Sequence, residues 1–152
     1  RIAAERAIAL NPMDGCTAAY IGLLMAYSGD WERGCALAER ARQLNPHHPG
    51  WYWFPSFCDA YRKSDCRGAL DLALKINMPG IWRANVVLAA AYGQLGDREA
   101  AREALRALLA LRPDFATVAR VELGKFWDPE LVEHLIEGGR KAGLEIPESS
   151  QR

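Results

Sequence analysis

An internal repeat constrains the fold of this chain more than any other feature. Residues 4–12 (AERAIALNP) and 38–46 (AERARQLNP) are identical at seven of nine positions and begin 34 residues apart. Prolines continue this spacing, at intervals of 34, 33 and 34 residues: Pro12, Pro46, Pro79 and Pro113. Each proline ends a stretch of helical periodicity, because it pushes the preceding residue out of the α region. The sequence therefore predicts stacked copies of one helical unit.

Small residues and turn signals divide each unit in two. Small side chains recur ten and twenty-two residues after the first three prolines: Gly22, Ser56 and Ala89, then Gly34, Gly68 and Ala101. Between them lie three turns: Gly29-Asp30, Ser64-Asp65 and Gly96-Asp97. Gly or Ser can end one helix and Asp can cap the next, while the small residues let two backbones approach. Each unit is therefore predicted to be an antiparallel helix pair.

Composition agrees with a helical protein and argues against two classes of partner. The 152 residues include 25 alanines and 18 leucines, both strong helix formers. The 19 basic residues balance the 19 acidic ones, so we expect no binding to nucleic acid or to an anionic membrane surface. Neither a membrane span nor a signal peptide is recognisable, which predicts a cytoplasmic protein.

The capping and proline signals set the expected element boundaries. No strand is expected, and one β-hairpin would contradict the interpretation. The predicted helices cover residues 2–10, 15–28, 31–44, 50–63, 66–77, 81–95, 98–111, 115–124 and 129–142.

The period, the small-residue positions and the closing proline resemble those of the tetratricopeptide repeat family. The resemblance covers whole repeats at 15–48, 49–81 and 82–115, and is strongest in Tyr92-Gly93-Gln94-Leu95-Gly96-Asp97. It implies an all-α, right-handed superhelical solenoid over residues 1–144. A partial repeat would precede the three whole ones, a capping helix pair would occupy 116–144, and 145–152 would form a flexible tail.

The amino terminus matches only the second helix of a repeat. An unpaired helix cannot bury its apolar face alone, so the chain is expected to be part of a longer protein. Its exposed stripe is predicted to fray or to form a homo-oligomer: Ile2, Ala3, Ala7 and Leu10.

A second resemblance rests on three segments, residues 45–52, 75–80 and 130–144. They look like the carboxyl-terminal repeat region of bacterial class III adenylate cyclases and related winged-helix regulators. No cyclase residues are present. The resemblance implies a bacterial signalling protein whose catalytic or DNA-binding output domain would lie upstream.

Motifs for catalysis, metals and cofactors are missing from the sequence. It contains no phosphate-binding loop, no nucleophile elbow and no zinc spacing, and Glu133-His134 is interpreted as part of a solvated acidic helix face. The four cysteines are interpreted as small apolar residues rather than as redox groups. We therefore expect neither an enzyme nor a bound metal or cofactor.

Aromatic residues indicate where a partner would bind. Residues 51–54 read Trp-Tyr-Trp-Phe, and neighbours on a helix point about 100° apart, so these rings cannot all face the core. Pro55 is expected to bend or delay its helix. The inner-groove positions of the family select the candidate protein-binding residues: Leu23, Tyr27, Trp53, Phe57, Tyr61, Arg83 and Gln94. For Trp53 and Phe57 a packing role between thin helices stays open.

Three functions remain possible on the sequence. The first is a scaffold or adaptor that binds a protein or an apolar peptide in its groove. The second is a regulatory domain that acts on its own output domain. The third is small-molecule sensing inside the superhelix.

Overall fold

The computed structural model describes residues 14–148, and this range contains α-helices, one short 3-10 helix and no strand. The predicted helix 2–10 and its apolar stripe lie outside the described residues. The elements in chain order are α2 (Gly15–Tyr27), α3 (Trp31–Leu44), η1 (Gly50–Trp53), α4 (Phe54–Arg62), α5 (Cys66–Ile76), α6 (Trp82–Leu95), α7 (Arg98–Leu111), α8 (Phe115–Gly124) and α9 (Pro129–Ala142).

Aspartates begin the second helix of each repeat, as the turn sequences predict. The Asp30 carboxylate accepts a hydrogen bond from Arg33 N, and Asp65 and Asp97 accept in the same way from residues three positions on. The residues before these aspartates adopt positive φ angles: Gly29, Ser64 and Gly96. The helix caps and turns therefore confirm the boundaries between the paired helices.

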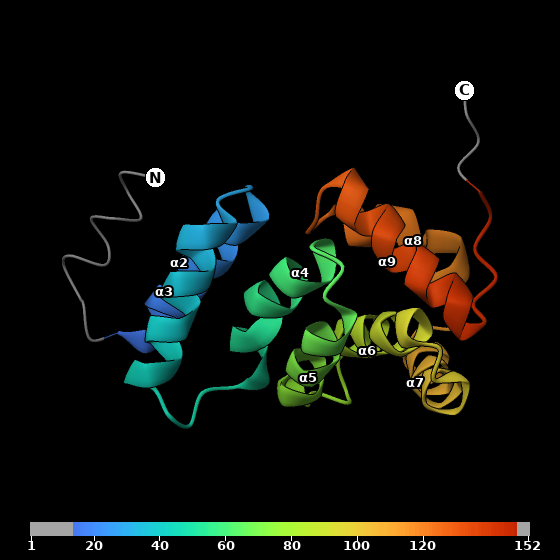
Figure 1. Cartoon of the computed structure of the whole chain (residues 1–152), viewed down its shortest axis with the longest axis horizontal. Helices are drawn as coiled ribbons and strands as arrows, with labels where there is room; N and C mark the ends of the chain where they lie inside the picture. Colours follow the sequence, from blue (N-terminus) through green and yellow to red (C-terminus); the bar gives the residue numbers. More distant parts are fainter. Residues whose placement is uncertain (1–13, 149–152) are drawn as a thin grey trace.

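Helices α2 with α3, α4 with α5, and α6 with α7 form three consecutive pairs (Figure 1). The first pair is in close contact at two glycines. A Cβ atom on Gly34 would lie 2.6 Å from the carbonyl oxygen of Gly22 and 2.5 Å from Ala26 N. Ala89 and Ala101 are buried between α6 and α7 in the corresponding positions. The predicted small-residue contacts are thus confirmed in the first and third repeats.

The second repeat begins irregularly. Its first helix is split into the 3-10 helix η1 and α4, and Pro55 stands in the first turn of α4. Proline is compatible with a first turn, where its missing N–H has no helical acceptor. The expected delay of this helix is therefore confirmed. Gly50 begins η1 so close to α5 that an added Cβ would overlap the carbonyl group of Ile76.

Helix α9 lies across the first helices of the second and third repeats. It packs chiefly against α6 and much less against α8, although α8 precedes it in sequence. The closest approach joins two glycines, since a Cβ on Gly93 would lie 2.1 Å from the Gly138 carbonyl oxygen. The predicted cap therefore covers the repeats, but α8 and α9 do not pack as closely as the helices of a repeat.

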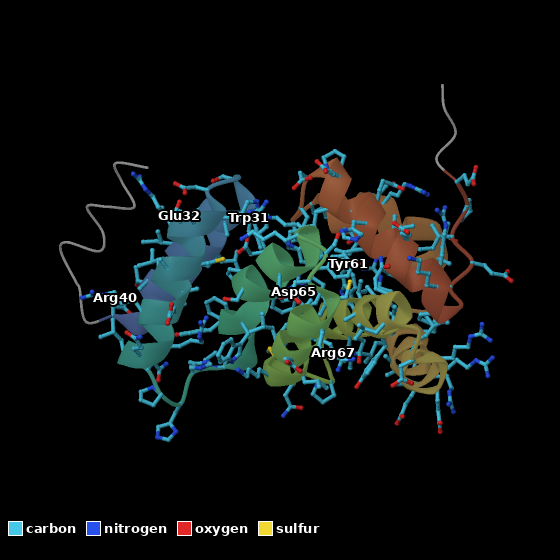
Figure 2. The ribbon with its side chains drawn as sticks, viewed as in Figure 1. Trp31, Glu32, Arg40, Tyr61, Asp65 and Arg67 are labelled. Carbon is cyan, nitrogen blue, oxygen red and sulfur yellow. The ribbon has the colours of Figure 1, made fainter. Side chains whose placement is uncertain are left out.

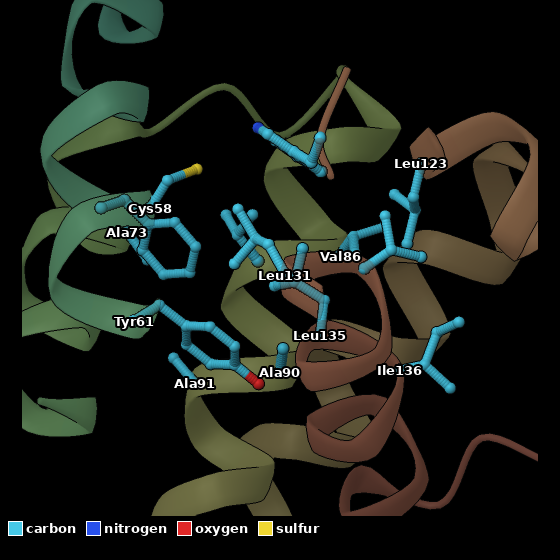
Figure 3. Packing of buried hydrophobic residues seen from close by; sticks show 14 of the residues in the cluster. Cys58, Tyr61, Ala73, Val86, Ala90, Ala91, Leu123, Leu131, Leu135 and Ile136 are labelled. Atoms are coloured by element: carbon cyan, nitrogen blue, oxygen red, sulfur yellow. The ribbon is translucent and has the colours of Figure 1, made fainter. Parts of the chain in front are cut away.

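The main core extends from α4 to the carboxyl-terminal segment (Figure 3). Leu131, Leu135 and Ile136 of α9 are buried in it, as predicted from their spacing. All four cysteines lie in the described range and none forms a disulfide. Burial raises the pKa of the Cys58 thiol, and raises that of Cys35 to about 11, which disfavours the reactive thiolate.

Tyr61 connects α4 to α9 and α6 through its hydroxyl group. The hydroxyl donates to the His134 carbonyl oxygen at 2.7 Å and accepts from Gln94 Nε2 at 3.1 Å. Figure 3 shows its ring beside Ala90 and Ala91. Burial raises the pKa of Tyr61 above that of an ordinary tyrosine.

Stability is expected to fall at alkaline pH because of this buried hydroxyl. A folded-state pKa above the unfolded value of about 10 gives stability that is complete below pH 10 and is lost as the pH rises. Above pH 10 the tyrosine ionises in the unfolded state while Tyr61 stays protonated in the folded state. The free energy of unfolding should therefore fall by up to about 1.4 kcal/mol per pH unit. Urea unfolding across this pH range measures the slope. Tyr61→Phe should reduce this slope, because the variant has no hydroxyl group at this position. Equal slopes for the wild type and Tyr61→Phe would contradict the assignment.

Candidate binding groove

An apolar groove opens between α2, the start of the second repeat and the connection from α8 to α9. Its volume is about 370 Å³. Among the described residues that line it, Arg83 is the one with a charged side chain. The groove residues are Tyr20, Leu23, Tyr27, Trp51, Phe54, Arg83, Phe126 and Trp127.

Helix α2 supplies one wall. Tyr20, Leu23 and Tyr27 follow the three- and four-residue spacing that places side chains on one face of a helix. Tyr20 is 57% exposed, and Leu23 and Tyr27 are partly buried. Tyr20 and Leu23 therefore offer apolar surface to a partner, while Tyr27 also packs against the main core.

The irregular start of the second repeat supplies Trp51 and Phe54. These residues are three apart, and in a 3-10 helix side chains at this spacing lie one above the other. Tyr52, between them, is instead buried against Ala18, Ala19 and Ala41 of the first repeat. The 3-10 turn thus places Trp51 and Phe54 at the groove and Tyr52 in the first repeat, and Phe54, only 5% exposed, also belongs to the main core.

Phe126 and Trp127 close the groove from the side of α9. They lie in the loop before Asp128, whose carboxylate caps α9 by accepting from Leu131 N. The Trp127 ring meets Tyr27 edge-on with centroids 5.8 Å apart, and lies 6.5 Å from Phe54. Aromatic contacts therefore join the first repeat to the carboxyl-terminal helices at the base of the groove.

Arg83 enters the groove from the first turn of α6. Its guanidinium group lies 4.3 Å from the centroid of Phe126. Burial raises the pKa of the Tyr27 hydroxyl, and the positive charge of Arg83 acts in the opposite direction. Arg83 is therefore close enough to influence groups on the α2 wall.

The groove brings together three of the predicted site residues: Leu23, Tyr27 and Arg83. Phe57 and Tyr61 are fully buried, and neither lines this groove. The Phe57 ring stacks on Tyr61 with centroids 5.5 Å apart. The packing role that the sequence left open for Phe57 is the one its burial supports.

Trp53 also lies elsewhere. Its ring contacts the Arg42 guanidinium at 3.9 Å and the Lys75 ammonium at 4.7 Å, so it sits between α3 and α5, the second helices of their repeats. The family offset assumes a regular helix, but Trp53 ends a 3-10 turn and points differently. Trp53 therefore does not line the groove beside α2.

Gln94 and Tyr61 are covered by α9. Gln94 Oε1 accepts a hydrogen bond from Lys141 Nζ at 2.8 Å, and its amide nitrogen donates to Tyr61. The inner positions of α4 and α6 are thus occupied by a helix of the same chain. Since α9 also buries several large apolar side chains, it forms a fixed wall, and the open part of the inner surface is the groove beside α2.

A second hollow, of about 550 Å³, lies between α9 and the turn after α4. It is lined by four acidic residues: Asp128, Glu130, Glu133 and Glu137. Glu133 pairs with Arg120 and Glu137 with Lys141. Trp31, labelled in Figure 2, lies under the Arg62 guanidinium, 5.0 Å from its ring centroid. Much of the charge in this hollow is therefore already paired.

Stacked helix pairs with a groove beside their first helices define an all-α solenoid of the tetratricopeptide type. No family model matches the chain, and no curated protein matches it. Among solved structures, the crystal structure of MamA is similar in fold, with a TM-score of 0.63 and 15% sequence identity. The match covers 91% of this chain and 84% of MamA.

Within residues 14–148, no helix is both long enough and apolar enough to cross a membrane. The same part of the chain holds no cluster of three or more His, Cys, Asp or Glu side chains arranged to bind a metal ion.

Proposed function

We propose that this chain is a non-catalytic interaction module that binds an apolar segment of a protein in the groove beside α2. The observation that carries the proposal is the lining of this groove, which is almost entirely apolar and includes six aromatic residues: Tyr20, Tyr27, Trp51, Phe54, Phe126 and Trp127. Its volume of about 370 Å³ falls in the range of specific ligand sites.

The residue types also favour a protein partner. Trp, Tyr and Arg are the residues that most often dominate the free energy of protein interfaces. Here they gather at the groove, and the rings are held in place by contacts with one another. A rigid aromatic surface loses little conformational entropy when a partner binds, which favours affinity.

Whether the bound segment belongs to a separate protein or to the same polypeptide is a separate question. A separate protein would make the chain an adaptor, whereas a segment of the same polypeptide would make it a regulatory domain. The similarity to MamA supports the fold and carries no information on this choice. The cyclase and winged-helix relationship stays a prediction from sequence.

Leu23→Asp is expected to weaken binding at least tenfold, because it places a charge in the apolar wall. Peptides selected from a random library by the wild-type protein serve as probes, and titration calorimetry measures their affinity. Leu23 is partly exposed, so the melting temperature should change little. Val121→Asp is the matched control, since Val121 is 69% exposed on α8 and does not line the groove.

Equal loss of affinity in both variants would contradict a site at this groove. Unchanged affinity in Leu23→Asp would contradict it as well, because a segment bound there must contact the α2 wall.

A further inference from the structure

Arg83 differs from the paired arginines of this protein. Arg62 pairs with Asp59, Arg112 with Asp114 and Glu122, and Arg120 with Glu133. Arg83 has no ion-pair partner among the described residues, and its guanidinium group packs on Phe126 instead. Its side chain is partly buried. The groove therefore holds one positive charge without an internal counter-ion.

The surroundings of Arg83 strengthen its effect on a bound segment. Aromatic walls exclude water, and a charge-assisted hydrogen bond is stronger where water is excluded. A guanidinium group can bind both oxygens of a carboxylate at once. A lysine or arginine brought into the groove would instead meet a like charge, which disfavours binding.

We infer that Arg83 determines partner specificity: the groove selects a segment in which an internal Asp or Glu lies beside large apolar residues. The carboxylate pairs with the Arg83 guanidinium, and the apolar side chains fill the space between α2 and Trp127. This inference rests on the proposed function, because it describes the partner of the same groove. Charge complementarity identifies the acidic side chain, and the aromatic lining identifies its neighbours.

The test uses a random library of short peptides with amidated carboxyl termini, so that a selected carboxylate belongs to a side chain. The wild-type protein should select peptides in which Asp or Glu lies beside Leu, Phe or Trp. Arg83→Glu should keep the apolar preference but select Lys or Arg. It should bind the wild-type peptides at least tenfold more weakly. Arg106→Glu makes the same charge change on the exposed face of α7 and should select like the wild type.

Arg83→Gln is the control for a folding defect that the new carboxylate of Arg83→Glu could cause. This neutral variant should lose the preference for acidic peptides without gaining one for basic peptides, and its melting temperature shows that it is folded. The inference would be overturned if the wild type and both Arg83 variants selected acidic peptides equally. In that case the proposed binding function of the groove would still stand if Leu23→Asp blocked peptide binding. If the wild-type protein binds no peptide of the library, the proposed function fails and the inference fails with it.

Discussion

Replacing Gly93 with alanine is expected to destabilise the protein by roughly 1–3 kcal/mol, although alanine is the better helix former. The new Cβ would lie 2.1 Å from the carbonyl oxygen of Gly138 and 2.9 Å from Ala142 N. Both atoms belong to the backbone of α9, so the contact cannot be relieved by moving a side chain. Helix α9 must shift away from α6, which loosens the packing of Leu131 and Leu135. Urea unfolding of the two proteins measures the difference.

Gly124→Ala provides the matched control for Gly93→Ala. Gly124 ends α8, and a Cβ built there meets no atom within 4 Å. This variant should be as stable as the wild type or up to about 1 kcal/mol more stable, because alanine favours the helix. If Gly93→Ala were equally stable, the close packing of α6 on α9 would be contradicted.

The position of α9 could not be predicted from the repeat pattern. The sequence places α9 next to α8, and pairing consecutive helices is the usual arrangement in a solenoid. The close approach of α9 to α6 requires glycine at Gly93 and Gly138, which are far apart in sequence. A glycine on a helix indicates that something approaches closely, but it does not show which element approaches.

The helix boundaries, in contrast, depend on local signals. Asp30, Asp65 and Asp97 cap the helices that follow them. These effects act within a few residues, so the sequence alone was enough to predict most described helices to within a residue or two. The exception is the second repeat, where the predicted helix 50–63 is divided between η1 and α4.

This division also limits what could be predicted about the groove. Leu23 and Tyr27 lie on a regular helix, and both of these residues, which the family offsets select, line the groove. Trp51 and Phe54 were not selected, because the offsets assume a helix where the chain forms a 3-10 turn. The three-residue spacing of Trp51 and Phe54 was the sequence signal that could have placed both residues on the same side of the chain. Phe126 and Trp127 lie in a loop that no repeat offset describes.

Phe57→Ala is expected to lower the free energy of unfolding by about 3–5 kcal/mol, the usual cost of removing a buried aromatic ring. Phe57 has no exposed surface and stacks on Tyr61, so the cavity would lie beside the residue that connects α4 to α9. Chemical unfolding measures the loss, and the folded variant should still bind the selected peptides with wild-type affinity.

Tyr20→Ala should give the opposite result, because Tyr20 lines the groove and is more than half exposed. Its unfolding free energy should change little, while truncation of a true contact residue should weaken peptide binding at least tenfold, which corresponds to about 1.4 kcal/mol. The two variants together separate packing from binding among the aromatic residues. A stable Phe57→Ala protein with lost peptide affinity would place Phe57 in the binding surface and contradict its role in the core.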